Sequence, residues 1–271
     1  MGQDMVIEVS VVVPAYNEED RLEPTVRDIV AYFRRVGRAA EVIVVDDGSR
    51  DGTASLVRSL GGEFPEVRLL RLPANSGKGY AVRAGVVNAR GNLVLFADAD
   101  GATPIEEIER LEAAIDAGAD VAIGSRAAQA AGVQVNTRFY RKVIGRAFHL
   151  LVQTLTVRGF QDTQCGFKLF RGDVAQDLFT RMHMKGFSFD VEVLLMARRG
   201  AHTVAEVPVN WTHQPGSRVN LVTDSLRMAR DLFIIRSNLL RGWYDQPHLQ
   251  PLYSTAPSRN AVVERRAVAA R

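Results

Sequence analysis

Two pairs of aspartates follow apolar stretches of the sequence. Asp46 and Asp47 end the run EVIVVDD, and Asp98 and Asp100 end the run NLVLFADAD. Carboxylate oxygens are hard ligands that suit Mg²⁺ or Mn²⁺, and such a site usually shares its ion with phosphate groups of a substrate. The pattern therefore indicates a site for a metal ion and a polyphosphate. Turn aspartates that cap the following helices are the alternative interpretation, and it explains Asp46 poorly.

The segment NSGKGYA, residues 75–81, is a second candidate for contact with an anion. Gly77 and Lys78 stand at the start of a predicted helix, whose first backbone N–H groups attract negative charge. The segment is not a Walker A loop, because the upstream glycine is missing and Tyr80 follows Gly79. The first predicted strand also lacks a following Gly-x-Gly-x-x-Gly, which argues against a dinucleotide-binding enzyme.

Strands and helices alternate through the first half of the sequence and must position these residues. Apolar runs predict strands, and amphipathic patterns predict helices. The strands are expected at 8–16, 41–47, 66–72, 92–98 and 120–126, and the helices at 23–37, 51–62, 77–91 and 104–118. This order predicts an α/β fold with a doubly wound, mostly parallel, Rossmann-like sheet. Ligands of such sheets bind beyond the carboxyl ends of the strands, so the two acidic strand ends are expected to meet in one crevice.

Two long, basic, amphipathic helices are predicted in the second half, at 137–157 and 225–244. The apolar side of the second helix is expected to hold Leu226, Ala229, Leu232, Phe233, Leu240 and Trp243. Such helices either pack on the sheet or lie in the interface of a membrane, and we expect the membrane. No run of about 18 apolar residues predicts a spanning helix. Residues 246–271 lack a clear periodicity and are expected to be a mostly disordered tail.

The charges of the 271 residues are distributed unevenly. Residues 1–130 carry 14 Lys and Arg against 21 Asp and Glu, whereas residues 131–271 carry 20 against 10. Random drift is one explanation, and the other is a second half that faces phosphate groups, lipid headgroups or nucleic acid. The basic helices have aliphatic faces with little aromatic interleaving, which favours a lipid surface and no nucleic acid. The single cysteine and the absence of a signal peptide fit a cytoplasmic protein.

Four motifs, in this order, resemble the GT-A glycosyltransferases of family 2: VVVPAYNEE, VIVVDDGSRDGT, NSGKGYAVRAG and ADADGAT. The later motifs IGSRA, DTQCGFKLF, FSFDVEVL, VPVNWTHQPGSRVN and DLFIIR resemble the dolichyl-phosphate (polyprenyl-phosphate) β-glucosyltransferase branch of that family. The resemblance implies one GT-A domain at 1–245 with two halves. The nucleotide-sugar half covers about 6–126, and the half that faces the acceptor and the membrane covers about 127–245. Eukaryotic members of the branch have an N-terminal membrane anchor, whereas this sequence starts directly on its first strand.

The resemblance also implies the reaction and its ligands. We expect an inverting, metal-dependent transfer of a hexose, glucose from UDP-glucose, onto a polyprenyl phosphate by an enzyme peripheral to the inner face of a membrane. GDP-mannose or a UDP-N-acetylhexosamine is the alternative donor, and a non-enzymatic membrane-associated homologue is the alternative function. Asp100 would hold Mg²⁺ or Mn²⁺. The nucleotide-sugar pocket would be lined by Pro14, Tyr16, Glu18, Asp46, Asp47, Gly77, Lys78 and Asp98.

The acceptor of such a reaction needs positive charge more than it needs a base. A phosphate monoester is largely dianionic near neutral pH, because its second pKa is about 6. Arg126, Arg138 and Arg141 are the candidates that would bind this phosphate. If a general base exists, Asp162 and Asp190 are the candidates, although the first can instead cap a loop and the second a helix.

Overall fold

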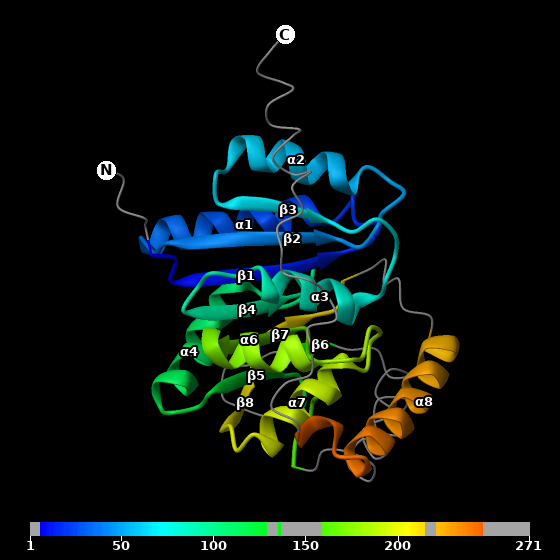
Figure 1. Cartoon of the computed structure of the whole chain (residues 1–271). Coiled ribbons are helices and arrows are strands. Elements are labelled where there is room, and N and C mark those ends of the chain that lie inside the picture. The colour runs from blue at the N-terminus through cyan, green and yellow to red at the C-terminus, as the bar shows by residue number, and fades with distance from the viewer. Residues whose placement is uncertain (1–5, 129–134, 137–158, 215–220, 246–271) are drawn as a thin grey trace.

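The computed structural model describes residues 6–128, 135–136, 159–214 and 221–245. Within them, seven strands form one sheet in the order β3-β2-β1-β4-β7-β5-β8 (Figure 1). They are β1 (Val9–Ala15), β2 (Ala40–Asp46), β3 (Val67–Arg71), β4 (Leu93–Ala97), β5 (Val121–Ser125), β7 (Phe167–Arg171) and β8 (Val204–Pro208). β7 runs antiparallel to β4 and β5, and the other pairings in this sheet are parallel. The predicted α/β fold with a mostly parallel sheet is therefore confirmed. The two-residue strands β6 (Val135–Asn136) and β9 (Trp211–Thr212) pair outside this sheet.

Helices cover both faces of the sheet. One face carries α1 (Leu22–Val36), α2 (Thr53–Glu63) and α4 (Ile108–Asp116), which follows the short η1 (Ile105–Glu107). The other face carries α3 (Lys78–Val87), α6 (Gly172–Arg181) and α7 (Phe189–Arg199). Successive side chains of a strand point to opposite faces, so Val11 and Val13 pack with the first set of helices and Val12 with the second. Burial on both faces explains why the central strands read as continuous apolar runs.

The strand order reverses between β1 and β4. The chain moves outward from β1 to β2 and β3, and α3 then carries it back to β4 on the other side of β1. The connections that follow β1 and β4 therefore leave the sheet in opposite directions, which opens a crevice at the carboxyl ends of these strands. β1 ends at Ala15 and β4 ends at Ala97, so the next residues, Tyr16 and Asp98, lie at this crevice.

The basic helix α8 (Leu221–Leu240) lies beside the sheet and is followed by the short η2 (Trp243–Asp245) (Figure 1). It packs inward through Leu232 and Ile235, which join the core that contains α3, α6 and α7. The expectation that Leu232 lies on the outward side is therefore wrong, because this side chain is fully buried. The exposed apolar side chains of α8 and η2 are Leu226, Phe233, Ile234, Leu240 and Trp243.

Two predicted segments lie outside the described residues. They are the basic helix at 137–157 and the tail at 246–271. Among the helices that the structure does describe, none is both long enough and apolar enough to cross a bilayer.

Candidate active site

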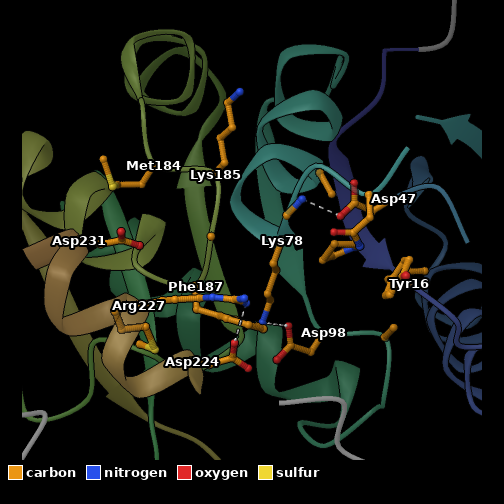
Figure 2. Close-up of a pocket in the computed structure, with 18 of the residues that line it drawn as sticks. Tyr16, Asp47, Lys78, Asp98, Met184, Lys185, Phe187, Asp224, Arg227 and Asp231 are labelled. Atoms are coloured by element: carbon orange, nitrogen blue, oxygen red, sulfur yellow. Dashed lines mark hydrogen bonds and ion pairs between the residues drawn. The ribbon is translucent and has the colours of Figure 1, made fainter. Parts of the chain in front are cut away.

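A cavity of about 640 Å³ lies at the carboxyl ends of β1 and β4. The strand ends and the turns after them form one side, which we call the strand-end wall. The 184–187 loop and α8 form the other side, which we call the helix wall (Figure 2). The strand-end wall includes Pro14, Tyr16, Glu18, Arg21, Asp47, Gly77, Lys78, Asp98 and Asp100. The helix wall consists of Met184, Lys185, Gly186, Phe187, Asp224, Arg227, Met228, Arg230, Asp231 and Ile234.

Asp47 ties the end of β2 to the start of α3. One carboxylate oxygen accepts the backbone N–H of Ser76 at 2.7 Å, and the other accepts that of Gly77 at 2.8 Å. Burial raises the pKa of this carboxyl, and the nearby charge of Asp46 adds to the rise, while the two N–H donors oppose it. The side chain thus lines the cavity and fixes the turn that presents Lys78.

Asp46 does not line the cavity, although it is adjacent to Asp47. Its side chain is fully buried, accepts the backbone N–H of Ser49 at 2.8 Å and pairs with Arg71 at 3.1 Å. These contacts show that Asp46 supports the turn between β2 and α2. Of the two adjacent aspartates, only Asp47 is among the residues that line the cavity.

Lys78 belongs to the strand-end wall, and its side chain lies between the labelled residues of the two walls (Figure 2). Its ammonium nitrogen is 2.7 Å from Asp98 and lies over the rings of Phe96 and Phe187. Burial lowers the pKa of this amine, but the carboxylates of Asp98 and Asp190 outweigh burial and raise it. Lys78 therefore stays protonated, and it balances the negative charge of the strand-end wall.

Asp98 and Asp100 both face the cavity from the turn after β4. Burial raises the pKa of Asp100, and the adjacent charge of Asp98 raises it further. A cation beside Asp100 would relieve this repulsion, and carboxylate oxygens suit Mg²⁺ and Mn²⁺. The described residues contain no cluster of three or more His, Cys, Asp or Glu side chains for a metal. The pair thus fits an ion whose remaining ligands are substrate phosphate oxygens and water.

Arg21 is a cation of the strand-end wall that no sequence motif indicated. Glu18 holds its guanidinium through two bonds of 2.8 and 2.7 Å. The hydrogen bond to Glu18 raises the pKa of Arg21, and the charges of Asp100 and Asp98 raise it further. The turn before α1, in which the backbone N–H of Arg21 donates to the carbonyl oxygen of Glu18 at 3.1 Å, brings the two side chains together. Glu18 therefore acts in the described structure as the anchor of an arginine that faces the acidic turn.

Arg126 and Asp162 bind each other, and neither lines the cavity. Two nitrogens of the guanidinium contact the two carboxylate oxygens at 2.6 and 2.8 Å. Burial favours the neutral acid, but the charge of Arg126 outweighs it and holds the pKa of Asp162 at about 2. The structure thus brings together a predicted phosphate ligand and a predicted base, and the two side chains form an ion pair with each other.

Asp190 is also paired and buried away from the cavity surface. The ammonium of Lys168 donates to its carboxylate at 2.6 Å and to the carbonyl oxygen of Cys165. Burial raises the pKa of Asp190, and the two cations Lys168 and Lys78 oppose that rise. The remaining predicted phosphate ligands, Arg138 and Arg141, lie outside the described residues.

The reversal of strand order and the paired aspartates at the end of β4 are the features of a GT-A glycosyltransferase. Residues 10–179 match the glycosyl transferase family 2, and the chain belongs to this family. It is similar to dolichyl-phosphate β-glucosyltransferases. The identity to that of Drosophila melanogaster is 41% over 251 residues, which are 87% of this chain and 76% of the relative. The identity to one of Trichomonas vaginalis is 42% over 233 residues, 82% of this chain and 68% of the relative.

A solved structure shares the fold. Glucosyl-3-phosphoglycerate synthase from Mycobacterium tuberculosis, in complex with Mn²⁺ and UDP-glucose, matches with a TM-score of 0.61 at 18% identity. The match covers 85% of this chain and 79% of the synthase. At this identity the likeness establishes the GT-A fold, so the predicted fold class is confirmed.

Proposed function

We propose that this glycosyltransferase moves glucose from UDP-glucose, with inversion, onto a polyprenyl or dolichyl monophosphate at a membrane surface. The observation that carries the proposal is the cavity in which Asp98 and Asp100 at a strand end lie opposite Arg227 and Arg230 of α8. The similarity to dolichyl-phosphate β-glucosyltransferases supports the choice of sugar and acceptor. The UDP-glucose bound by the fold neighbour supports the choice of nucleotide.

The strand-end wall would bind the donor. Tyr16, Glu18 and Asp47 lie on the side of the cavity next to β1 and β2, where they would contact the nucleoside together with Pro14 and Gly77. Asp98 would contact the ribose and diphosphate region, and Asp100 would hold Mg²⁺ or Mn²⁺. A divalent ion in that place supplies charge that stabilises the leaving nucleoside diphosphate.

The acceptor half of the reaction would proceed without a dedicated base. A phosphate monoester is largely dianionic near neutral pH, so it can attack the anomeric carbon with no proton to give up. Asp162 and Asp190, the two candidate bases, are each held by a cation and do not line the cavity. The support that they give to Arg126 and Lys168 accounts for both residues without a proton-transfer role.

The acceptor phosphate would instead meet the arginines of α8. Arg227 and Arg230 line the cavity, and each guanidinium pairs weakly with an aspartate of the same helix, at 3.5 Å with Asp224 and 3.2 Å with Asp231. Both side chains are 73% exposed, so these ion pairs contribute about 1 kcal/mol or less. The exposed guanidinium N–H groups of Arg227 and Arg230 are therefore available to donate to a phosphate dianion.

The outer side of α8 would lie on the membrane. Exposed arginines that are not among the cavity-lining residues, Arg236 and Arg241, accompany its exposed apolar side chains. An exposed Trp243 at the end of this surface suits the headgroup region. Apolar burial and attraction to anionic lipid would act together on such a surface. We call Leu226, Phe233, Leu240 and Trp243 the outer apolar face.

A panel of donors tests the proposal. The purified protein is incubated with a short polyprenyl phosphate, Mn²⁺ and UDP-glucose, GDP-mannose or UDP-N-acetylglucosamine in turn. We expect lipid-linked sugar from UDP-glucose alone, and no product when EDTA replaces Mn²⁺. Equal turnover of all donors would refute the donor assignment, and full activity in EDTA would refute the metal site.

A further inference from the structure

The 184–187 loop of the helix wall is held from behind by a buried carboxylate. Glu192 on α7 is fully buried, and one of its oxygens accepts the backbone N–H groups of His183 and Met184 at 2.9 and 2.6 Å. A buried acid costs free energy unless donors satisfy it. Burial raises the pKa of Glu192 to about 7, although the donors from Met184 and Tyr244 oppose the rise. The loop therefore depends on Glu192 for its position.

The second oxygen of Glu192 reaches the segment that follows α8. It accepts the hydroxyl of Tyr244 at 2.9 Å, and Asn238 on α8 lies 3.5 Å from that hydroxyl. Tyr244 is itself 5% exposed. One carboxylate thus joins α7, the cavity loop and the end of the α8–η2 unit.

The inner side of the loop packs closely against the turn that carries Lys78. The backbone N–H of Tyr80 donates to the carbonyl oxygen of Lys185 at 3.1 Å. A Cβ atom on Gly77 would lie 2.4 Å from that oxygen, and one on Gly79 would lie 2.6 Å from the carbonyl oxygen of Met184. These glycines therefore allow a close fit between the loop and the turn. A shift of the loop must move Lys78, which contacts Asp98.

The outer side of the same unit ends at the surface. The indole of Trp243 lies 5.3 Å from the imidazole of His183, measured between ring centroids. Trp243 is 40% exposed, and Leu240 is 73% exposed. A continuous series of contacts therefore runs from the outer apolar face through His183 and Glu192 to the loop, and from the loop to the turn at Lys78.

We propose that Glu192 and Tyr244 are positioning residues that couple the outer apolar face to the nucleotide side of the cavity. The 184–187 loop transmits the coupling, because among the segments just described it contacts both the Glu192 carboxylate and the Gly77–Gly79 turn. Occupation of the cavity by UDP then changes the surroundings of Trp243, and loss of the Tyr244 hydroxyl loosens the loop and the turn together. The part that concerns UDP rests on the proposed function, whereas the mechanical part does not.

Hydrogen exchange tests the mechanical part. The Tyr244→Phe variant removes one hydroxyl, and Tyr32→Phe is the matched control, because Tyr32 is buried on the opposite face of the sheet with its hydroxyl 3.1 Å from Glu109. We expect amide exchange in segments 76–82 and 182–188 to be about fivefold faster in Tyr244→Phe and unchanged in Tyr32→Phe. A Glu192→Gln variant keeps an oxygen for the two loop N–H groups and should show slower exchange than Glu192→Ala. Unchanged exchange at 76–82 in Tyr244→Phe would overturn the coupling.

Fluorescence tests the part that depends on the nucleotide. The chain contains two tryptophans, so Trp211→Phe leaves Trp243 as the only one. With calorimetry run in parallel, UDP and Mn²⁺ should change the emission of Trp243, and Tyr244→Phe should reduce this change at saturating UDP. Saturated UDP binding with no change in emission contradicts the coupling. Absence of UDP binding in the parent protein contradicts the proposed donor instead, and the exchange experiment still decides the role of Tyr244.

Discussion

The two walls of the cavity are built in different ways. On the strand-end wall, backbone groups fix the carboxylates: Asp47 accepts two N–H groups of the α3 turn, and Asp100 accepts that of Ala102 at 3.1 Å. On the helix wall, the two arginines lie largely in solvent. Arg227 and Arg230 are 73% exposed and pair with aspartates of their own helix.

The difference corresponds to the two substrates that we propose. A nucleotide sugar has a defined shape, and a wall fixed by strand ends is organised for it before binding. A lipid-linked phosphate arrives from a surface, and long exposed arginines can adjust to it. We therefore expect substitutions on the strand-end wall to act on the donor and the metal, and those on the helix wall to act on the acceptor and the membrane.

The largest effect is expected at Asp100. Asp100→Asn removes the charged ligand that we propose for the metal and should lower kcat by about 10³-fold, since charge stabilisation of the leaving group is worth several kcal/mol. Circular dichroism should show a retained fold. Asp116→Asn, at an exposed aspartate of α4, is the control and should keep full activity. If the Asp100→Asn enzyme keeps the kcat of the parent, the proposal that Asp100 binds a metal on the strand-end wall is wrong.

The contact between the walls is the next target. Gly77→Ala places a Cβ against the carbonyl oxygen of Lys185 and puts alanine at a φ of +104°. Such backbone conformations cost on the order of 1–3 kcal/mol for residues other than glycine, so we expect the free energy of unfolding to fall by about 2 kcal/mol.

Gly62→Ala on α2 is the matched control, because nothing lies within 4 Å of its added Cβ. It should be neutral or stabilise the helix by up to about 1 kcal/mol. Denaturant unfolding measures both variants. Equal stabilities would mean that the two walls are not in the close contact described above.

The Arg126–Asp162 pair should act on stability and not on catalysis. The pKa of Asp162 is lowered to about 2 in the folded protein, so the unfolded chain binds more protons in the window between this value and the ordinary one near 4. The pair therefore stabilises the fold above pH 4 by about 2 kcal/mol, at 1.36 kcal/mol per unit, and this stability is lost as the pH falls toward 2. Asp162→Asn should abolish this part of the acid transition. An acidic limb of kcat that vanishes in this variant would return Asp162 to the role of a base.

Arg227 tests the helix wall in turn. Arg227→Gln should raise the KM for the polyprenyl phosphate about tenfold and leave the affinity for UDP unchanged. Arg236→Gln, an exposed arginine of α8 that is not among the cavity-lining residues, is the control. If Arg227→Gln weakens the binding of UDP and leaves the KM for the polyprenyl phosphate unchanged, the assignment of the acceptor to the helix wall is wrong.

The smallest effect is expected at the outer apolar face. The parent protein should float with anionic liposomes at low salt and partly dissociate at high salt, because each basic residue near the surface contributes roughly 1 kcal/mol that salt screens. Leu226→Ser with Phe233→Ser should reduce flotation about fivefold. Val36→Ser, at an exposed valine of α1, should not. A double variant that floats as well as the parent, or one that changes the oligomeric state instead, would show that this face does not meet lipid.

The strand-end wall was largely predictable from the sequence, and the reason is topological. Tyr16, Asp47 and Asp98 follow apolar runs, and strands of one parallel sheet must end at a common edge. The helix wall was not predictable in this way. The 184–187 loop and α8 reach the cavity because Leu232 and Glu192 are buried in one particular arrangement, and no sequence period encodes such contacts.

The pairing of charged side chains is the second feature that could not be predicted from the sequence. Arg126 and Asp162 have the residue types that phosphate binding and proton transfer need, but their positions in motifs do not reveal that they face each other. Likewise, the Gly-Lys-Gly segment suggested contact with an anion, whereas the structure adds a second reason for its glycines, the close approach of the loop carbonyls. Tertiary contacts decide whether a charged side chain faces a ligand or a partner.

Transfer of radiolabelled glucose tests the central claim most directly. The protein, Mn²⁺ and labelled UDP-glucose are mixed either with a short polyprenyl phosphate in anionic vesicles or with 3-phosphoglycerate, the compound that appears in the name of the fold neighbour. We predict label in the organic phase in the first mixture, no transfer in the second, and no label in the organic phase with Asp100→Asn. Transfer to 3-phosphoglycerate with none to the lipid would contradict the proposed acceptor, and absence of transfer in both mixtures would contradict the proposed reaction.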